Sequence, residues 1–516
     1  MTLLAPWLES LPDAVEQRAL DEWAIGQLGI PGLDLMERAG TGLAELVSER
    51  VPHGRIVVVC GSGNNGGDGY VAARVLRARG RDVLVLGLAP RDNLHGDARV
   101  NAQRLPGEGP QPFAAEALTG ASAIVDAILG TGFSGEAREP AAAAIAAINA
   151  AEASVIACDM PSGVNGSTGE IAGPAVGAAA TATFHAAKPG LWIAPGKHHA
   201  GEVRVIEIGI PADGPVNPAI GLIDNLVTDG IPRRGRESTK FAAGSVLVCG
   251  GSLGLTGAPC LASESAMRAG AGYVTAFVPS SLNAVFEGRL LEVMTVPLPD
   301  DEGSLTPEGA ARVLERIARA DSLVLGPGLG RERGAQDLAR GLALAAEIPL
   351  LLDADGLNAH AGVLASLAQR RAPTVLTPHA GELARLLDSD SARVDAGRLR
   401  SVRRAAETAR SIVVLKGDDT LIAEPGGRVA ISRGGAPALA TAGTGDVLSG
   451  VIGAYLAKGM DPFHAACAGV YVHVCAGRRA SQRLGREGVI ARDVIEALPH
   501  VLPAPPETAS RASPRS

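Results

Sequence analysis

The segment Thr441–Gly450 (TAGTGDVLSG) has the residue types and spacing of a phosphate-handling helix terminus. Its Gly443–Gly445 turn leads into an apolar helix that we expect to start near Asp446, so free backbone N–H groups and the positive end of the helix dipole face one point. Such an anion hole stabilises a phosphoryl group in transfer, and Asp446 beside it can accept a hydroxyl proton. The alternative is that Asp446 only caps the helix behind a glycine turn. We favour phosphoryl transfer because the strand end LKGDDT (Leu415–Thr420) precedes the turn; without a GxxxxGK[ST] motif, a P-loop protein is not indicated.

The segment Gly61–Tyr70 (GSGNNGGDGY) follows an apolar run at Ile56–Cys60 and contains the GxGxxG spacing of dinucleotide-binding turns. That spacing recurs at Gly130–Gly135, and with 66 glycines in 516 residues it is expected by chance about once. Its surroundings are more informative. Asparagine and aspartate side chains occupy the turn where a hydride-transfer Rossmann enzyme needs small residues, and no acidic residue ends the next apolar run, Val83–Leu88. A phosphate-bearing ligand is therefore favoured over a hydride-transfer cofactor.

Oxygen-bearing side chains stand at further places where apolar runs end. Asp126 lies in VDAILGTGFSG, and Asp159 and Ser162 lie in CDMPSG. Because ligands of parallel α/β sheets bind at the carboxyl ends of strands, Asn65, Asp126 and Ser162 could converge on a hard cation, and one carboxylate with neutral oxygens suits a monovalent ion better than Mg²⁺. The alternative is a set of turn formers and helix caps. For proton transfer, Asp159 and Asp126 are the candidates.

These residues must be positioned by two successive sets of alternating strands and helices. Unbroken apolar runs separated by helix-like segments indicate parallel sheets covered on both faces. In the first half the runs are Ile56–Cys60, Val83–Leu88, Ile124–Leu129, Val155–Cys158 and Val203–Ile208, with helices expected at Gly69–Arg79, at Pro140–Ala151 and across residues 10 to 50. In the second half they are Ser245–Cys249, Val274–Val278, Leu323–Leu325, Leu350–Leu352, Thr374–Leu376 and Ile412–Leu415, followed by mostly helical sequence from Asp446 to Leu498.

The alternation lapses between the two halves and at the carboxyl end, which sets the expected domain boundaries. We expect an α/β protein with an N-terminal Rossmann-like three-layer domain at residues 1–215 and a second α/β domain at 238–502. The Pro/Gly-rich and charged stretch at 216–237 is interpreted as a linker. The Pro- and Ser-rich tail at 503–516 is expected to be disordered.

The composition is that of a soluble globular protein and excludes several classes. Hydrophobic residues make up 46% and charged residues 20% of the chain. The net charge of −8 shows no long run of one sign and aromatic residues are only 3%, so action mainly on DNA or RNA is not expected. We find no secretory signal and no membrane-length apolar stretch, and expect a cytoplasmic protein without a membrane partner. Six scattered cysteines without a CxxC pair are expected to be buried free thiols.

In their order and spacing, GSGNNGGDGY, VDAILGTGFSG and CDMPSG resemble the NAD(P)H-hydrate epimerase family over about residues 10–210. A small departure is Ser62, where that family usually has proline. The resemblance implies that Asn65, Asp126 and Ser162 hold a potassium ion. It also implies contacts with the hydrated dinucleotide from Asn64, Asn65, Gly66, Gly67, Asp68, Gly130, Thr131, Gly132, Phe133, Ser134, Gly135, Glu136 and Asp159.

In the second half, the GTGD turn at a helix start resembles the ribokinase-like superfamily, and we expect the C-terminal domain to be ribokinase-like. Together with GPGLG, LTPHAGE and LKGDDT, it resembles the ADP/ATP-dependent NAD(P)H-hydrate dehydratases over about residues 238–500. This resemblance implies Mg²⁺, and ADP as the nucleotide that bacterial members generally use. It implies contacts with the hydrate from Ala258, Gly328, His379 and Asp446, and with the nucleotide from Lys416, Gly417, Asp418, Asp419, Thr420 and Gly445. The segment Gly434–Ala438 departs from the NPGMA-like stretch expected there.

Together the two halves resemble the bifunctional repair enzymes of hydrated nicotinamide dinucleotides. The resemblance implies NADHX and NADPHX as substrates, epimerisation of their R and S forms, and dehydration of the S form through a phosphorylated hydroxyl, with Asp446 as the base. We expect a homo-oligomer. One alternative is a ribokinase-like kinase of a vitamin alcohol with an accessory N-terminal domain, which LTPHAGE and the fused first half disfavour. Another is a non-catalytic binding module in the first half, which the Asn65, Asp126 and Ser162 set disfavours.

Overall fold

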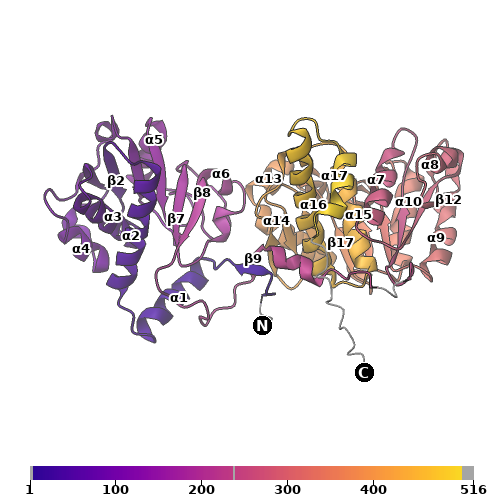
Figure 1. Ribbon diagram of the computed structural model, residues 1–516, viewed down its shortest axis with the longest axis horizontal. Helices are drawn as coiled ribbons and strands as arrows, with labels where there is room; N and C mark the ends of the chain where they lie inside the picture. The colour runs from indigo at the N-terminus through magenta and orange to yellow at the C-terminus, as the bar shows by residue number, and fades with distance from the viewer. Residues whose placement is uncertain (1–3, 236–238, 503–516) are drawn as a thin grey trace, which may run out of the picture. The chain divides into compact units, whose positions relative to one another are not determined.

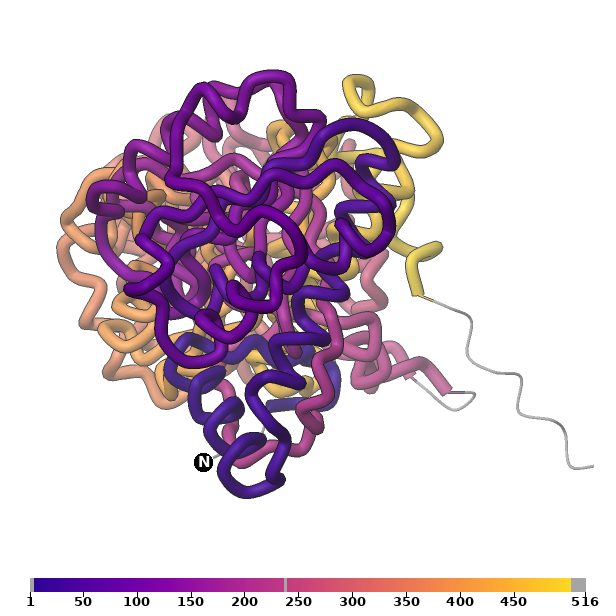
Figure 2. The backbone as a smooth tube through the Cα atoms, turned by 90° about the vertical axis from the view of Figure 1, so that its left-hand side faces the viewer, coloured from indigo at the N-terminus to yellow at the C-terminus, as the bar shows by residue number. Residues whose placement is uncertain are grey.

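The computed structural model describes residues 4–235 and 239–502, and the chain forms two compact units (Figure 1). Unit one contains the chain up to Leu222 together with Ala392–Arg400, and unit two contains Ile223–Ser391 and the chain from Ser401 onward. Figure 2 traces the backbone of both units from indigo at the N-terminal end to yellow in the last helices. The expected tail at 503–516 lies outside the described residues. Within those residues, none of the helices has both the length and the apolar character needed to cross a bilayer.

Unit one is built on a parallel sheet whose strands lie in the order β4-β3-β2-β5-β6-β7-β8. These strands are β2 (Ile56–Cys60), β3 (Val83–Gly87), β4 (Gln111–Pro112), β5 (Ala123–Ala127), β6 (Ser154–Cys158), β7 (Ala180–Phe184) and β8 (Glu202–Ile206). The helices are α1 (Ala14–Gly26), α2 (Gly32–Arg50), α3 (Asn64–Ala78), α4 (Gly96–Gln103), α5 (Ala141–Ala150) and α6 (Lys197–Ala200). Two short strands, β1 (Leu8–Ser10) and β9 (Ile220–Ile223), are neighbours. Just after β1, the N–H of Leu11 donates to the carbonyl of Ile220 at 3.0 Å.

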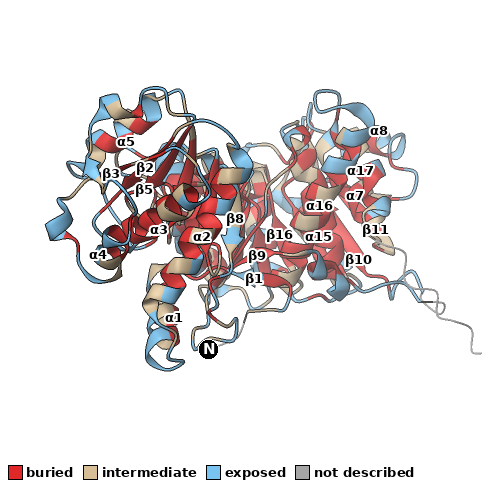
Figure 3. Cartoon of the chain, turned by 60° about the vertical axis from the view of Figure 1, so that its left-hand side comes forward, coloured by how far each residue is buried: buried red, intermediate tan, exposed pale blue. Residues whose placement is uncertain are grey.

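Helices cover both faces of this sheet, as the apolar runs predict. Alternate side chains of β2 enter two separate cores, since successive residues of a strand face opposite sides. Ile56 and Val58 pack in one core with residues of α2 and α3, whereas Val57 and Val59 pack in a second core with Ile145 of α5. Figure 3 shows the central strands β2 and β5 buried and the outer face of α5 exposed. The predicted three-layer α/β/α arrangement is confirmed.

The strand order reverses at β2, which has β3 on one side and β5 on the other. In open α/β sheets, ligands bind in the crevice outside the carboxyl ends of the strands at such a reversal. Helix α1 begins with a capping box: the Asp13 carboxylate accepts from the N–H groups of Val15 and Glu16 at 2.9 Å, and Glu16 accepts from the N–H of Asp13 at 2.8 Å. This cap fixes the start of the helix whose polar face lines the cavity of unit one.

Unit two contains a larger sheet, in which the strands of this unit follow the order β20-β19-β18-β17-β16-β15-β10-β11-β12. They are β10 (Ser245–Cys249), β11 (Tyr273–Pro279), β12 (Met294–Leu298), β15 (Ser322–Leu325), β16 (Leu350–Leu352), β17 (Thr374–Leu376), β18 (Ile412–Leu415), β19 (Leu421–Ala423) and β20 (Val429–Ile431). The neighbours from β12 to β18 are parallel, and β19 and β20 add antiparallel pairs. A separate antiparallel pair is formed by β13 (Asp300–Asp301) and β14 (Ser304–Leu305).

The helices in this part of the chain follow the pattern of a doubly covered sheet. They are α7 (Gly257–Arg268), α8 (Asn283–Glu287), α9 (Ala310–Ile317), α10 (Arg333–Ala345), α11 (Asp355–Asn358), α12 (Ala380–Leu386), α13 (Ser391–Ala396), α14 (Arg398–Ala409), α15 (Thr444–Ala457), α16 (Pro462–Leu484) and α17 (Ala491–Ala497). Almost all of α15 is buried, and it packs against α7, α16 and β15. A helix that is apolar on all sides belongs in an interior. Its N-terminal end is therefore held rigidly beside the sheet.

Helix α3 begins earlier than the sequence predicts, at Asn64 rather than Gly69, so NNGGD forms its first turns. Glycines disfavour helix, but here they permit close packing, which outweighs their intrinsic preference. A Cβ atom on Gly66 would lie 2.1 Å from the carbonyl oxygen of Gly61, and one on Gly67 would lie 2.6 Å from the Met36 sulfur.

The segment 216–237, expected to be a linker, contains packed structure in its described part. Strand β9 is followed by a 3-10 helix at Asn225–Gly230, and the side chains of Val227 and Ile231 are buried. The carbonyl of Val227 accepts from His464 Nε2 of α16 at 2.8 Å. The boundary between the two units therefore falls inside β9 rather than in an unstructured stretch.

Candidate functional site

Unit one contains a cavity of about 1130 Å³ at the carboxyl ends of β2, β5 and β6. This is the crevice at the reversal of strand order, and helix α1 closes part of it. The predicted substrate contacts that line it are Asn64, Asn65, Asp68, Gly130, Thr131, Gly132, Phe133, Ser134, Glu136 and Asp159. Three predicted contacts do not line the cavity: Gly66 and Gly67 serve helix packing, and Gly135 takes a positive φ of 84° in the loop. The cavity volume is large enough for a dinucleotide-sized ligand.

Asp159 is the most constrained carboxylate of this cavity. It follows β6 with a φ of 62°, a left-handed conformation that is strained for residues other than glycine and clusters at functional sites. Its Oδ2 accepts from the backbone N–H of Thr131 at 2.7 Å and from the Thr131 hydroxyl at 2.6 Å, while its Oδ1 lies 3.1 Å from Lys188 Nζ. Burial alone would raise the pKa of Asp159, but the ammonium of Lys188 and the bonds from Thr131 outweigh burial and lower it.

A second carboxylate, Asp68 in α3, faces the same cavity under the opposite influence. Burial, together with the negative charges of Asp159 and Asp21, raises the pKa of Asp68 well above its ordinary range. Asp21 on α1 is bonded by Gln17 Nε2 at 3.0 Å, and burial raises its pKa as well. The cavity thus contains one carboxylate whose pKa is lowered, Asp159, and two whose pKa values are raised, Asp68 and Asp21. Neighbouring acids whose pKa values are shifted in opposite directions are typical of sites for acid–base catalysis.

The predicted cation ligands are brought to one end of the sheet but not into one bonded cluster. The carboxylate of fully buried Asp126 accepts from the Ser162 hydroxyl at 2.6 Å and from the Ser162 N–H at 2.8 Å. Burial raises the pKa of Asp126 to about 6 despite these bonds. The amide of Asn65 is buried, and neither its oxygen nor its nitrogen has a hydrogen-bond partner among the described residues. An unpaired buried amide oxygen at the same end of the sheet as a buried carboxylate fits a monovalent cation.

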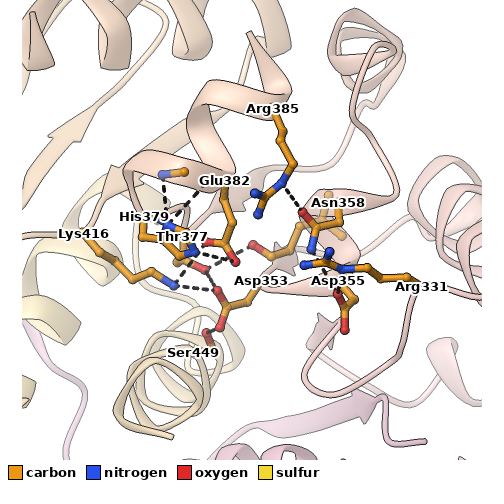
Figure 4. Close-up of polar contacts among 12 residues, drawn as sticks. Arg331, Asp353, Asp355, Asn358, Thr377, His379, Glu382, Arg385, Lys416 and Ser449 are labelled. Carbon is orange, nitrogen blue, oxygen red and sulfur yellow. Dashed lines mark hydrogen bonds and ion pairs between the residues drawn. The ribbon is translucent and has the colours of Figure 1, made fainter. Parts of the chain in front are cut away.

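Unit two places a polar network at the carboxyl ends of β16, β17 and β18 (Figure 4). Its centre is Asp353, a residue directly after β16 whose side chain is 2% exposed. Oδ1 accepts from the Thr377 hydroxyl at 2.8 Å and from Lys416 Nζ at 3.0 Å, and Oδ2 accepts from the Ser449 hydroxyl of α15 at 2.7 Å. Lys416 Nζ also lies 3.7 Å from Glu382 Oε2. The ammonium of Lys416 is therefore held between two carboxylates.

Asp446 lies in the first turn of α15, which begins at Thr444 behind Gly443 in the left-handed conformation with a φ of 88°. Asp446 is not the N-cap, and no side chain caps this helix start, so the alternative of a purely capping aspartate is not supported. A Cβ atom on Gly445 would lie 3.5 Å from Lys416 Nζ. Lys416 and Gly445, both predicted to contact the nucleotide, are therefore close together at the start of α15. Burial, reinforced by the negative charge of Asp353, raises the pKa of Asp446 to about 7 against the lowering effect of Lys416.

The remaining predicted residues of unit two include Ala258, Gly328 and His379. A Cβ atom on Gly328 would lie 3.2 Å from the Cβ of Ala258, so these two are neighbours. His379 is the N-cap of α12, and its Nδ1 accepts from the N–H of Gly381 at 3.0 Å, a structural role that the sequence analysis did not include.

The turn Lys416–Thr420 is closed by the Thr420 hydroxyl, which donates to the Gly417 carbonyl at 2.7 Å. The side chain of Asp419, a residue of this turn, is buried. Asp418 Oδ1 accepts from the N–H of Gly435 at 2.9 Å, which ties the divergent Gly434–Ala438 segment to the predicted nucleotide turn.

Sequence reasoning missed several residues that the structure brings into these sites. The missed residues are Lys188 and Thr183 in unit one and Asp353, Thr377, Glu382 and Ser449 in unit two. For Asp353 a signal was present, because Leu350–Leu352 followed by aspartate is the same strand-end pattern as at Asp126 and Asp159. For Lys188 and Ser449 no local pattern separates them from ordinary loop and helix residues. The expected free cysteines are confirmed, since all six are unpaired and only Cys475 is partly exposed.

Two family models match this chain: that of the YjeF-related protein N-terminus over residues 32–190, and that of NAD(P)H-hydrate dehydratase over residues 246–500. The bifunctional NAD(P)H-hydrate repair enzyme of Moorella thermoacetica is 40% identical over 511 residues, covering 95% of this chain and 96% of that protein. The enzyme of the same name from Salinibacter ruber is 38% identical over 515 residues, covering 94% of each.

Among solved structures, the ADP/ATP-dependent NAD(P)H-hydrate dehydratase of Bacillus subtilis co-crystallised with ATP/Mg²⁺ is 29% identical and covers 53% of this chain and 94% of that one, with a TM-score of 0.45. The near full-length match to curated relatives shows that this chain belongs to the family of bifunctional NAD(P)H-hydrate repair enzymes.

Proposed function

We propose that the two units divide the repair of hydrated nicotinamide dinucleotides between them. NADHX and NADPHX have gained water across a ring double bond, which leaves a hydroxyl at C6 in R and S forms. Unit one interconverts these epimers, and unit two removes water from the S form at the expense of a nucleotide. The observation that carries the proposal is the pair of differently tuned aspartates, Asp159 in the cavity of unit one and Asp446 at the start of α15.

In unit two, dehydration proceeds through a phosphorylated hydroxyl, because hydroxide is a poor leaving group. Asp446 accepts the C6 hydroxyl proton while the oxygen attacks the terminal phosphoryl group of the nucleotide; the bond from that phosphorus to the bridging oxygen breaks, and the nucleotide leaves one phosphate shorter. A pKa of about 7 suits a general base near neutral pH. The N–H groups of the first turn of α15 and the ammonium of Lys416 stabilise the phosphoryl charge. The ring-nitrogen lone pair then expels phosphate, and loss of a proton from the neighbouring carbon restores the dihydropyridine.

The nucleotide is proposed to be ADP, bound by Lys416–Thr420 and Gly445, and Ala258, Gly328 and His379 to contact the hydrate. Mg²⁺ usually binds one or two carboxylates together with substrate phosphates. The described residues contain no cluster of three or more His, Cys, Asp or Glu side chains arranged for a metal, which fits an ion that arrives on the nucleotide. Bound there, Mg²⁺ would screen the phosphate charge.

In unit one, Asp159 is the proposed proton acceptor. The C6 hydroxyl takes a proton from solvent and departs as water while the ring-nitrogen lone pair forms a double bond to C6; water then returns to the other face and gives its proton to Asp159, which releases it to solvent. Asn65, Asp126 and Ser162 are the proposed potassium ligands, with the unpaired Asn65 amide as the structural support. Potassium there would hold the phosphate-facing loops.

The direct test incubates the purified protein with mixed NADHX epimers, with and without ADP, and follows the absorbance of restored NADH. We expect complete recovery of both epimers with ADP, and interconversion of R and S without it. Phosphorylation of a vitamin alcohol such as hydroxyethylthiazole or pyridoxal, in place of NADHX repair, would establish the alternative kinase function instead. Light scattering of the same preparation tests the proposed homo-oligomer.

A further inference from the structure

Lys188 lines the cavity of unit one with a side chain that is only 1% exposed. A buried ammonium needs partners for all of its N–H groups, because an unpaired buried charge is strongly destabilising. Lys188 Nζ donates to the carbonyl of Phe184 at 2.8 Å and to the hydroxyl of Thr183 at 3.1 Å, and it lies 3.1 Å from Asp159 Oδ1. An ammonium has three donors, so these partners occupy all of them.

The two oxygens of Asp159 are held from opposite sides. Lys188 holds Oδ1, which also accepts from the Thr183 hydroxyl at 3.5 Å, and the N–H and hydroxyl of Thr131 hold Oδ2. The backbone is fixed as well, since the N–H of Asp159 donates to the carbonyl of Ala182 at 2.7 Å. Five contacts and a left-handed φ thus over-determine the position of Asp159, which is how a strained functional residue persists.

Arg18 and Arg138 line the same cavity, but among the described residues the cation in contact with the Asp159 carboxylate is Lys188. Asp68 and Asp21 are acidic, and the Cys158 thiol is buried with a raised pKa. Burial and the charge of Lys188 lower the pKa of His185, which favours its neutral form. Lys188 is therefore the group that balances the charge of Asp159.

We propose that Lys188 is a positioning residue for the epimerase: it holds the Asp159 carboxylate in place and balances its charge, without touching the substrate. The inference rests on the proposed role of Asp159 as proton acceptor. With its three N–H groups occupied, Lys188 has none to donate to the dinucleotide. It acts through Asp159, by keeping the carboxylate able to accept a proton at neutral pH.

The test measures the pH profile of epimerisation for Lys188→Met, Lys188→Arg and Thr131→Val in the full chain. In Lys188→Met the lowering effect of the ammonium disappears while burial remains, so the pKa of Asp159 rises. Because the carboxylate is no longer held in place, the rate at about pH 7 should fall at least about tenfold. Because its pKa rises, the acid limb of the profile should move up by about one pH unit or more. Thr131→Val should move the limb in the same direction by less, and Lys188→Arg should restore it towards that of the parent. Dehydration by the same protein reports that the chain is folded, and Lys240→Met, at an exposed lysine of unit two, is the matched control.

Each outcome decides something. A Lys188→Met protein with a lower rate but an unmoved acid limb would have a purely structural defect, which overturns the proposal. If Lys188→Met does not fold, the pH profiles of Thr131→Val and Lys188→Arg are compared instead. Acid limbs at the same pH in these two variants would overturn the proposal. Asp159→Asn separates the proposed role of Asp159 from that of Lys188. Full epimerase activity of Asp159→Asn refutes the role of Asp159 as proton acceptor. If Asp159→Asn is inactive and the acid limb of Lys188→Met is unshifted, only the role of Lys188 is refuted.

Discussion

Each unit contains a lysine next to an aspartate at a strand end, buried in unit one and partly buried in unit two, but the two pairs affect the functional carboxylates in opposite ways. In unit one, Lys188 lies 3.1 Å from Asp159, the proposed proton acceptor itself. In unit two, Lys416 lies 3.0 Å from Asp353, and the proposed base Asp446 is a separate residue on α15. The pKa of Asp159 is lowered, whereas that of Asp446 is raised to about 7.

The difference shows that the pKa of the functional carboxylate depends on whether the cation contacts that carboxylate directly, and not only on whether a cation is present in the site. Lys416 is flanked by Asp353 and Glu382, so little of its charge remains to stabilise an ionised Asp446. Burial and the surrounding carboxylates then dominate at Asp446. In unit one the cation and the functional carboxylate are in direct contact, and the cation prevails over burial. The same two residue types thus produce a base near neutrality in one unit and a readily ionised carboxylate in the other.

The largest expected effect is that of Asp446→Asn on dehydration. Asparagine cannot accept the hydroxyl proton, and a positioned general base contributes about 10²–10⁴-fold to the rate. We expect a loss of this size in NADH recovery with ADP, while interconversion of the R and S epimers by the same protein is unchanged. Near-normal dehydration by Asp446→Asn would show that Asp446 is not the base, and the comparison between Asp446 and Asp159 would lose its functional meaning.

The unmodified protein should show the same contrast in its pH dependence. The base must be ionised, so dehydration should fall by about tenfold per pH unit as the pH drops below about 7, the value to which the pKa of Asp446 is raised. Epimerisation should persist to lower pH, because the pKa of Asp159 is lowered. Both rates are measured in one buffer series on one preparation. Coincident acid limbs would contradict the assignment.

Asp353→Asn tests the unit-two side of the comparison. The change removes a negative charge that raises the pKa of Asp446, so the acid limb of dehydration should move to lower pH. It also loosens Lys416, and we expect a loss of about tenfold in kcat/KM for the nucleotide. Exposed Asp301→Asn is the control of equal chemistry. A limb that stays in place, or moves to higher pH, argues against control of Asp446 by Asp353.

Asp126→Ala tests whether unit one also contains a cation. We expect binding of the hydrated dinucleotide to weaken several-fold, on the order of 1 kcal/mol, and any potassium dependence of epimerisation to disappear. Binding and rate are measured in potassium and in lithium salts, with exposed Asp92→Ala as the control. An Asp126→Ala protein that responds to potassium as the parent does refutes the site.

The smallest effect is expected for His379→Asn. Asparagine is also a good N-cap, so thermal stability should change little, and loss of a cap altogether in His379→Ala should cost about 1 kcal/mol. If His379 contacts the hydrate as well as capping α12, His379→Asn should raise KM for NADHX without lowering the unfolding temperature. Unchanged KM in the asparagine variant would leave capping as its role.

Much of the fold is predictable because the sheet strands are unbroken apolar runs. The bounds of β2, β10, β16, β17 and β18 agree with the predicted runs at every residue. The prediction missed β7, whose sequence ATATF contains two buried threonines that interrupt the apolar pattern. It also missed the early start of α3, since helix formation by NNGGD depends on packing against β2 and α2 rather than on propensity.

The sequence by itself determined the α/β class, the family and the positions of the motif residues, because these depend on local patterns of apolar runs, glycines and strand-end carboxylates. Only the tertiary structure decided which charges are neighbours. Lys188 is 29 residues from Asp159 and Lys416 is 63 from Asp353, yet each pair is in contact. A pKa depends on burial and on charge through space, neither of which is encoded in residue spacing. The opposite tuning of Asp159 and Asp446 is therefore a property of the fold rather than of the motifs.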